Sequence, residues 1–164
     1  MGGGASGESV PAAVQSNPEL NKICHQTDYP DICLSAIAPY MDDLGKRPDA
    51  ASVLEFSVKA VSEQTQSAIT TAEKVASGSG VSAEETSAIN DCKDSYTDAL
   101  ENLKGVTDAI SSSDVATMNG KLNSVITDFT DCDDFLKGFT LPLQALNARL
   151  TKIATNCLAL VTLI

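Results

Sequence analysis

Four stretches of the chain repeat apolar or small residues at alternating steps of four and three, and this pattern constrains the fold most strongly. The first stretch carries them at Leu54, Val58, Val61, Thr65, Ala68, Ala72 and Val75. The second carries them at Ile89, Cys92, Tyr96, Ala99, Leu103, Val106 and Ile110. The third carries them at Val115, Met118, Leu122, Val125, Phe129, Cys132 and Leu136. The fourth carries them at Leu143, Leu146, Leu150, Ile153, Cys157, Leu160 and Ile164. Because these steps place one side chain per turn on the same helix face, each stretch is predicted to be a long helix with one buried face.

Short breaks with helix-capping residues separate the four stretches. Ser82 is followed three residues later by Glu85, the spacing of a capping box, and Asp114 is a suitable cap for the third helix. Gly138 and Pro142 mark the end of the third helix and the start of the fourth. Short loops force neighbouring helices to run antiparallel, so the fold class is expected to be all-α, an up-down four-helix bundle.

The N-terminal part of the chain differs in composition from the bundle segment 49–164. Residues 1–16 are rich in Gly and Ser without periodicity, and they are expected to form a flexible tail. Residues 17–48 contain two helix-start signals, Asn17-Pro18 and Asp28-Tyr29-Pro30, and are predicted to form a hairpin of short helices. Hairpin and bundle together form one predicted domain, 17–164.

The heights of the cysteines along antiparallel helices predict two disulfides. Cys92 and Cys132 each lie 20 residues from the turn near residue 112, on the inward faces of consecutive helices. A bridge between them closes a loop of about 40 residues, for which the chain-entropy account gives roughly 4 kcal/mol of stabilisation. Cys24 and Cys33 flank the turn near residue 28 in the same way. Cys157 lies roughly 13 Å too far along its helix to reach Cys132, so we expect a free, buried thiol.

Charge and cysteine usage limit the partners and the compartment. The net charge of −11, from 22 acidic and 11 basic residues, disfavours binding to nucleic acid and to anionic membrane surfaces, and it favours basic protein partners. No apolar run approaches the length of a membrane span. Two disulfides require an oxidising compartment, so the protein is predicted to be secreted.

The residues for metal binding or catalysis are lacking in the sequence. His25 is the sole histidine, and Cys24 and Cys33 beside it do not have the C-x₂-C spacing of a zinc knuckle or of a redox pair. No Gly-x-Ser-x-Gly elbow and no phosphate-binding glycine loop is present. The chain is therefore interpreted as a non-enzyme without metal or cofactor, and the Cys24–Cys33 pair as a structural clamp.

Four motifs resemble the plant invertase and pectin methylesterase inhibitor family. They are "TDYPDIC" ending at Cys33, "NDCKDSYTDALENL" around Cys92, "TDCDDF" around Cys132, and the C-terminal "NCLALVTLI". The resemblance covers about residues 17–164. It implies a helical hairpin before a four-helix bundle, disulfides between the first and second and between the third and fourth cysteines, and a secreted plant protein that binds a cell-wall enzyme one-to-one.

The resemblance favours pectin methylesterase over acid invertase as the target. The invertase branch carries Pro-Lys-Phe after Gly-Asp in the loop between the second and third bundle helices. Here Asp114 matches, but Val115, Ala116 and Thr117 occupy the place of Pro-Lys-Phe. Inhibition of acid invertase remains an alternative, as do a carrier of a small apolar ligand in the bundle core and an excised pro-region of a methylesterase.

In methylesterase inhibitors the residues flanking the fourth cysteine, commonly Thr-Cys-Glu-Asp, lie at the enzyme interface. Here Asp134 matches, Asp133 is a conservative replacement, and Asp131 replaces the threonine. The predicted contact residues lie on the second and third bundle helices, off the buried faces. They are Asp94, Thr97, Asp98, Glu101, Thr127, Asp128, Asp131 and Asp134. Solvated helix faces are the alternative interpretation of these polar rows.

Overall fold

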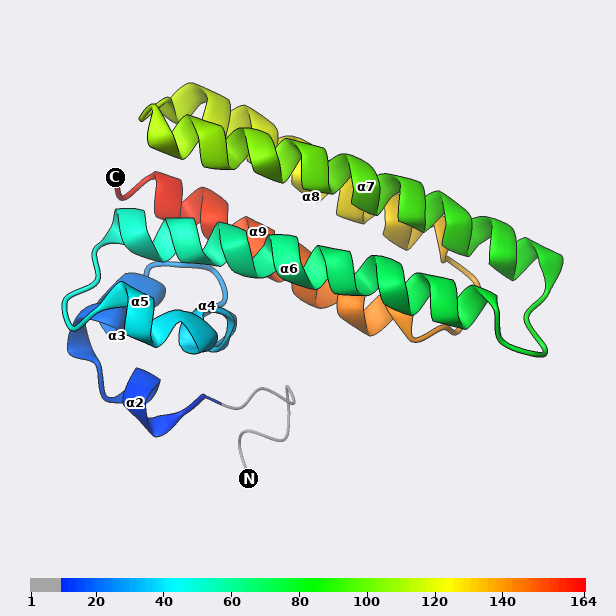
Figure 1. The fold of residues 1–164 in the computed structure, drawn as a ribbon, viewed down its shortest axis with the longest axis horizontal. Coiled ribbons are helices and arrows are strands. Elements are labelled where there is room, and N and C mark those ends of the chain that lie inside the picture. Colours follow the sequence, from blue (N-terminus) through cyan, green and yellow to red (C-terminus); the bar gives the residue numbers. More distant parts are fainter. Residues whose placement is uncertain (1–9) are drawn as a thin grey trace. The chain divides into compact units, whose positions relative to one another are not determined.

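The computed structural model describes residues 10–164, in which four long helices pack together after a series of short ones (Figure 1). The short helices are α2 (Ala12–Gln15), α3 (Pro18–Cys24), α4 (Pro30–Ile37), the 3-10 helix η1 (Ala38–Tyr40) and α5 (Met41–Leu44). The long helices are α6 (Ala50–Ala76), α7 (Ala83–Ser111), α8 (Val115–Phe135) and α9 (Leu143–Val161). The predicted all-α architecture is confirmed. None of the helices in the described part has the length and apolar character that crossing a membrane requires.

Two compact units share the long helices α6 and α9. One unit comprises the described residues up to Val61 together with Lys152–Ile164, and the other comprises Ser62–Thr151. The second unit therefore contains all of α7 and α8 and parts of α6 and α9. The division does not follow the predicted boundary between 17–48 and 49–164, because α6 and α9 each extend through both units.

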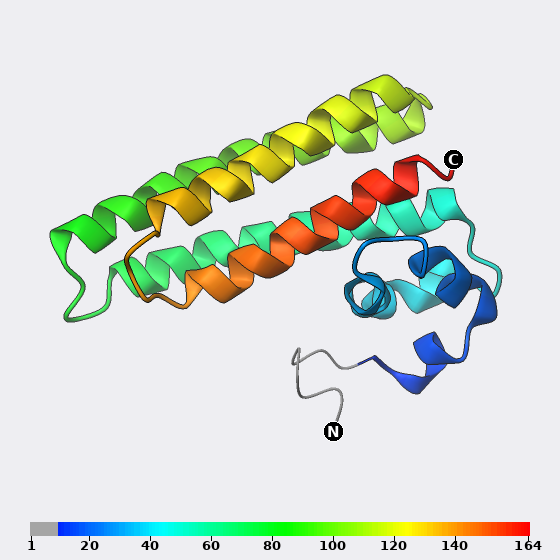
Figure 2. The same ribbon diagram turned by 180° about the vertical axis from the view of Figure 1, so that it is seen from behind.

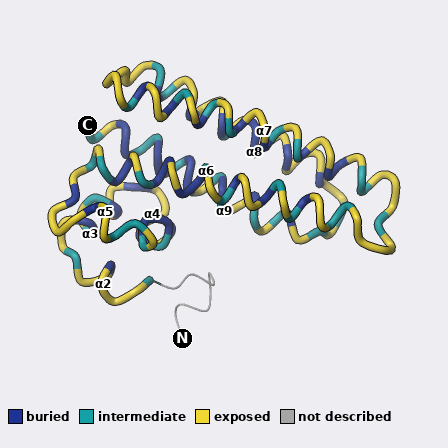
Figure 3. The backbone as a smooth tube through the Cα atoms, viewed as in Figure 1, coloured by how far each residue is buried: buried dark blue, intermediate teal, exposed yellow. Residues whose placement is uncertain are grey.

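The buried faces of the long helices follow the predicted spacing. Figure 3 shows buried and exposed positions alternating along each long helix. The exceptions are half-buried Val75, Ile110 and Leu146 and exposed Val115 and Ile164. Val115 is the first residue of α8 and Ile164 follows the end of α9, so neither lies within a full turn of a packed helix.

The predicted helix caps are present at α7 and α8. The Ser82 hydroxyl accepts a hydrogen bond from the Glu85 backbone N–H at 3.0 Å, and the Ser82 N–H donates to the Glu85 carboxylate at 2.9 Å. At α8, an Asp114 carboxylate oxygen accepts from the Thr117 N–H at 3.1 Å. These bonds satisfy backbone donors that the first turn of a helix leaves free.

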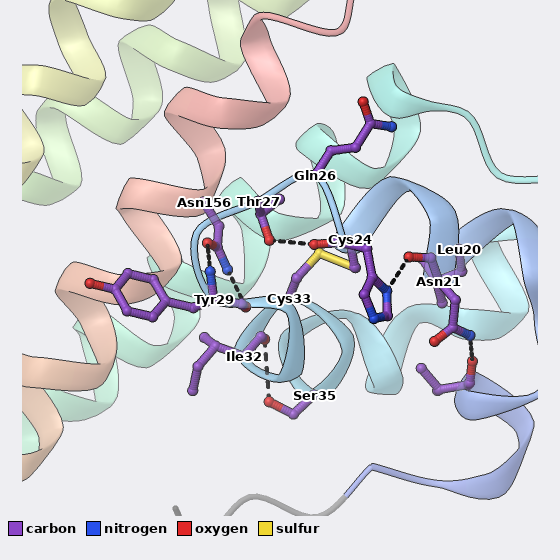
Figure 4. Close-up of a disulfide and its surroundings, with 12 residues drawn as sticks. Leu20, Asn21, Cys24, Gln26, Thr27, Tyr29, Ile32, Cys33, Ser35 and Asn156 are labelled. Carbon is purple, nitrogen blue, oxygen red and sulfur yellow. Dashed lines mark hydrogen bonds between the residues drawn. A yellow bond between two sulfur atoms is a disulfide. The ribbon is translucent and has the colours of Figure 1, made fainter.

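The Cys24–Cys33 disulfide clamps α3 to α4, as predicted (Figure 4). The turn between the two helices is held from α9, because buried Asn156 accepts from the Tyr29 N–H at 3.0 Å and donates to the Tyr29 carbonyl at 2.9 Å. The His25 Nδ1 lies 2.7 Å from the Asn21 carbonyl at the end of α3. His25 is thus an exposed helix-end residue, in agreement with the interpretation of this segment as a structural clamp.

The predicted tail 1–16 is wrong for its last residues. Helix α2 begins after Pro11, and Val14 within it is 1% exposed. The Asn21 side chain donates to the carbonyls of Val14 and Gln15 at 3.2 and 2.8 Å. A single buried valine and one bridging amide therefore order a segment whose composition carries no helical periodicity. The rest of the predicted tail, 1–9, lies outside the described residues.

The turn between α7 and α8 places a serine in the left-handed backbone region. Ser113 has a φ of 55°. The Asp114 N–H donates to the Ala109 carbonyl at 2.9 Å and the Ser113 N–H to the Ile110 carbonyl at 3.2 Å. These two bonds form a Schellman motif, in which glycine is the preferred residue at the position of Ser113.

Ser113→Gly is expected to raise the free energy of unfolding by about 1 kcal/mol, because a non-glycine residue in the left-handed region costs roughly 1–2 kcal/mol. Equilibrium urea unfolding measures the change. Ser112→Gly is the matched control, since Ser112 has a φ of −98° and no strain to relieve. Equal stabilisation by both variants, or destabilisation by Ser113→Gly, would contradict the prediction.

Candidate functional site

Helices α7 and α8 carry all eight predicted contact residues, and both lie in the same compact unit. The two helices run side by side along their length (Figure 2). The predicted Cys92–Cys132 disulfide is present, with a Cα–Cα distance of 4.6 Å, and both cysteines are buried. The bridge therefore fixes which residues of α7 lie at the same height as which residues of α8.

Seven of the eight predicted residues are exposed. They are Asp94, Thr97, Asp98, Glu101, Thr127, Asp131 and Asp134. The two threonine hydroxyls each donate to the carbonyl four residues earlier, Thr97 to Lys93 and Thr127 to Asn123, both at 3.0 Å. Asp134 forms an exposed ion pair with Lys137 at 3.5 Å.

The eighth residue, Asp128, was predicted to lie with the exposed contact residues, and this prediction is wrong. Asp128 is only 9% exposed. The Asn102 side chain of α7 donates to Asp128 Oδ2 at 3.2 Å and to Asp98 Oδ2 at 3.3 Å. Asn102 thus holds two carboxyl groups together across the two helices, and α7 covers the residue that helix spacing alone placed beside the buried face.

The Asp98–Asp128 pair opens into a polar groove of about 450 Å³ between α7 and α8. The groove is lined by Asp98, Asn102, Asn123, Ser124, Thr127 and Asp128. It brings together three of the predicted residues, and the other five do not line it. Sequence reasoning missed Asn102, Asn123 and Ser124, because a polar residue on a helix surface gives no signal of what the neighbouring helix places beside it.

The pKa of Asp128 is raised from 3.8 to about 7, and burial of the carboxyl group is the largest cause. A hydrogen bond with Asp98, the negative charge of Asp98 and the charge of Asp131 contribute in the same direction. The hydrogen bond from Asn102 acts in the opposite direction. Because two neighbouring carboxylates repel each other, one of the pair retains a proton well above the usual pH for an aspartate.

The groove contains acidic and polar groups without the parts of a catalytic device. Cys157, the only cysteine outside the two disulfides, is buried, and burial raises the pKa of its thiol to about 12, which leaves it unreactive. Among residues 10–164, no cluster of three His, Cys, Asp or Glu side chains could hold a metal ion. The carboxyl, amide and hydroxyl groups of the groove can accept hydrogen bonds from a cationic or polar partner.

One further functional candidate is Asn147 of α9. The sequence pattern predicted Leu146 as the buried residue in this turn of the helix. The structure leaves Leu146 half-buried and buries Asn147 completely. A signal was available in the sequence, because Asn147 lies four residues after Leu143 and three before Leu150, both on the buried face.

The free energy of unfolding is expected to fall between pH 5 and pH 8, because the pKa of Asp128 is higher in the folded than in the unfolded chain. The stabilising proton is fully bound below pH about 4 and is lost as the pH rises through about 7. A loss of at least about 1 kcal/mol is expected, since one pKa unit corresponds to roughly 1.4 kcal/mol. Urea unfolding at both pH values measures it.

Asp128→Asn is expected to flatten this pH dependence and to be more stable than the wild type at pH 8. Asp91→Asn, at an exposed position of α7, is the control and should retain the wild-type slope. A wild-type protein equally stable at pH 5 and pH 8 would show that the Asp98–Asp128 pair does not hold a proton.

Comparisons with known proteins agree with this fold. A pectin methylesterase inhibitor from Arabidopsis thaliana has a similar structure, with 18% sequence identity, a TM-score of 0.67 and coverage of 90% of this chain and 96% of that one. A mutant form of an Arabidopsis pectin methylesterase inhibitor matches with 17% identity, a TM-score of 0.73 and coverage of 89% and 97%. At these identities the similarity establishes the fold. No curated protein matches the sequence.

The family follows from a separate comparison. The family model described as plant invertase/pectin methylesterase inhibitor matches residues 18–160, which is most of the chain. This agrees with the four sequence motifs and with the two disulfides in their expected pairing. The protein therefore belongs to the plant invertase/pectin methylesterase inhibitor family, a family of enzyme inhibitors rather than enzymes.

Proposed function

We propose that the protein inhibits a plant cell-wall pectin methylesterase by forming a non-covalent one-to-one complex in which helices α7 and α8 cover the active-site cleft. The observation that carries this proposal is the acidic, rigid pair of helices. Residues 83–137 contain twelve acidic and four basic residues, a net charge of −8 out of −11 for the whole chain. Such a surface suits a basic enzyme partner.

Rigidity of the two helices supports the proposal. The buried Cys92–Cys132 bridge holds α7 to α8 near the C-terminal end of α8, and the Asn102 side chain of α7 joins the helices again at Asp128. A surface ordered before binding loses little conformational freedom on binding, so more of the contact energy contributes to affinity. A stable surface that occupies the active-site cleft is sufficient to exclude the substrate.

The choice of pectin methylesterase over acid invertase rests on the start of α8. Val115, Ala116 and Thr117 stand where the invertase branch carries Pro-Lys-Phe, and they form the first turn of the helix. The two similar solved structures are described as pectin methylesterase inhibitors. Acid invertase is the second candidate, because the family model covers inhibitors of both enzymes.

Secretion to the cell wall is part of the same proposal. Two disulfides are stable in an oxidising compartment outside the cytosol. The raised pKa of Asp128 also favours the folded chain in a mildly acidic medium, because the carboxyl group is protonated there without cost.

Titration of the protein against a purified plant pectin methylesterase at pH about 5–6, a range in which carboxyl groups titrate, is expected to abolish activity at one-to-one stoichiometry. A purified acid invertase in a parallel titration is expected to keep its activity. Asp134→Ala should weaken inhibition without changing thermal unfolding, because Asp134 is exposed at the proposed contact.

Glu55→Ala, which removes an exposed acid on α6, is the matched control and should inhibit like the wild type. Inhibition of invertase alone would overturn the choice of target. Unchanged inhibition by Asp134→Ala would show that this part of α8 lies outside the interface.

The association rate with the methylesterase is expected to fall as the salt concentration rises, because screening weakens long-range attraction between an acidic inhibitor and a basic enzyme. Stopped-flow measurements at several ionic strengths test this. The double variant Asp94→Asn/Glu101→Gln should associate more slowly and depend less on salt.

Glu19→Gln/Asp31→Asn removes two exposed charges outside α7 and α8 and serves as the control, with a smaller expected effect. A rate independent of salt would remove electrostatic steering from the mechanism.

A further inference from the structure

A fully buried amide joins three helices in the unit that contains α7 and α8. Asn147 of α9 is 0% exposed and is a polar residue on a helix face whose other residues are apolar. A buried amide is costly unless its donors and acceptor are satisfied.

The Asn147 side chain uses both of its amide hydrogens and accepts one hydrogen bond at its oxygen. The Tyr96 hydroxyl of α7 donates to Asn147 Oδ1 at 3.0 Å. Asn147 Nδ2 donates to the Phe129 carbonyl of α8 at 2.7 Å and to Asp133 Oδ1 at 2.6 Å. Phe129 and Tyr96 are buried, whereas Asp133 is exposed. The amide thus connects the core to one carboxylate on the surface.

The direction of these bonds is fixed by Phe129 and Asp133. A backbone carbonyl and a carboxylate only accept hydrogen bonds, so the amide nitrogen of Asn147 must face them. The amide oxygen then faces the Tyr96 hydroxyl, which donates to it and whose pKa is raised by burial and by the charge of Asp133. The Asn147 amide consequently has one orientation, and that orientation presents an N–H to Asp133.

Asp133 differs in this respect from the acidic residues next to it. Asp134 is paired only with Lys137, at 3.5 Å, and the side chains of both are more than half exposed. Such an exposed pair leaves both side chains mobile and contributes little. Asp133 has one oxygen held by a buried donor, so its carboxylate loses little freedom when a partner approaches.

We propose that Asn147 is a positioning residue of the inhibitory surface, which holds Asp133 in place to receive a lysine or arginine side chain of the enzyme. This inference rests on the proposed function and names the chemistry of one contact within it. A carboxylate fixed through one oxygen keeps its remaining lone pairs for a basic group, and charge-assisted hydrogen bonds of this kind are among the stronger contacts at interfaces.

A double-mutant cycle on the inhibition constant tests the proposal. Asp133→Asn is expected to weaken inhibition about tenfold, a typical loss for a charge-assisted contact. Asn147 is removed together with its hydroxyl partner, as Tyr96→Phe/Asn147→Leu, because replacing both partners by apolar groups of similar shape leaves no buried polar group unpaired. This double variant should fold, and it should weaken inhibition by a similar factor.

The decisive result is the combination of the two changes. Adding Asp133→Asn to Tyr96→Phe/Asn147→Leu is expected to cause little further loss, because the carboxylate is already unrestrained. Asp134→Asn is the matched control, and its effect should be the same with and without Asn147. Circular dichroism melting curves of every variant check that the fold is retained.

Each alternative result has a distinct meaning. Losses from Asp133→Asn and Tyr96→Phe/Asn147→Leu that multiply fully would show that Asn147 only stabilises the fold and would overturn the proposal. Full inhibition by Asp133→Asn would overturn it while leaving the proposed function intact. A wild-type protein that inhibits no pectin methylesterase would contradict the proposed function itself, and with it the partner assigned to Asp133.

A readout without enzyme tests the positioning step separately. In the wild type, the side-chain amide protons of Asn147 are expected to exchange slowly with solvent and to have distinct NMR shifts, because both are hydrogen-bonded in a buried site. Asp133→Asn should shift one of them strongly, whereas Asp134→Asn should leave both in place. Rapid exchange of both protons in the wild type would contradict the geometry on which the proposal depends.

Discussion

The disulfide between Cys92 and Cys132 is the constraint on which the α7–α8 surface depends. A covalent link between buried positions of two antiparallel helices fixes their relative height to within a fraction of a turn. That height determines which polar residues meet across the helices, so Asn102, which contacts Asp98 one turn earlier on α7, also reaches Asp128 of α8. It also brings the Tyr96 hydroxyl to 3.3 Å from Cys132 Sγ. At this position the hydroxyl donates a hydrogen bond to the Asn147 side chain of α9. The partners that α7 and α8 supply to both polar clusters of this unit therefore lie at heights consistent with this one bridge.

The sequence predicted the parts of the fold that depend on spacing alone. Steps of four and three identify the buried face of a helix, and equal distances from a turn identify cysteines at the same height, so the long helices and both disulfides were predictable. Predictions failed where residue spacing does not show which other segment of the chain packs against a residue. Val115 and Ile164 continue the apolar pattern beyond the point where another helix covers it. Val14 is buried by a contact that composition does not reveal.

The candidate site was less predictable, because burial of a polar side chain depends on what the neighbouring helix provides. Asp128 follows the spacing of a flanking, solvated residue, yet Asn102 and Asp98 of α7 cover it. Asn147 shows the reverse case, since its position on the apolar face was visible in the sequence but its partners Tyr96, Phe129 and Asp133 come from two other helices. Helix periodicity locates a face, and only packing determines the contacts on that face.

The two clusters also resolve a conflict between the proposed function and the stability of the fold. A surface that attracts a basic enzyme concentrates negative charge, and like charges at close range destabilise the helices that carry them. At Asp128 the conflict is reduced because the raised pKa favours a protonated carboxyl group beside Asp98. Asp133, in contrast, is exposed, and its carboxylate accepts a hydrogen bond from the buried Asn147 amide. The fold thus favours the neutral form of the carboxyl group that is hidden, and it holds the exposed one in place. A binding surface needs this distribution, because only an exposed charge can be recognised by a partner.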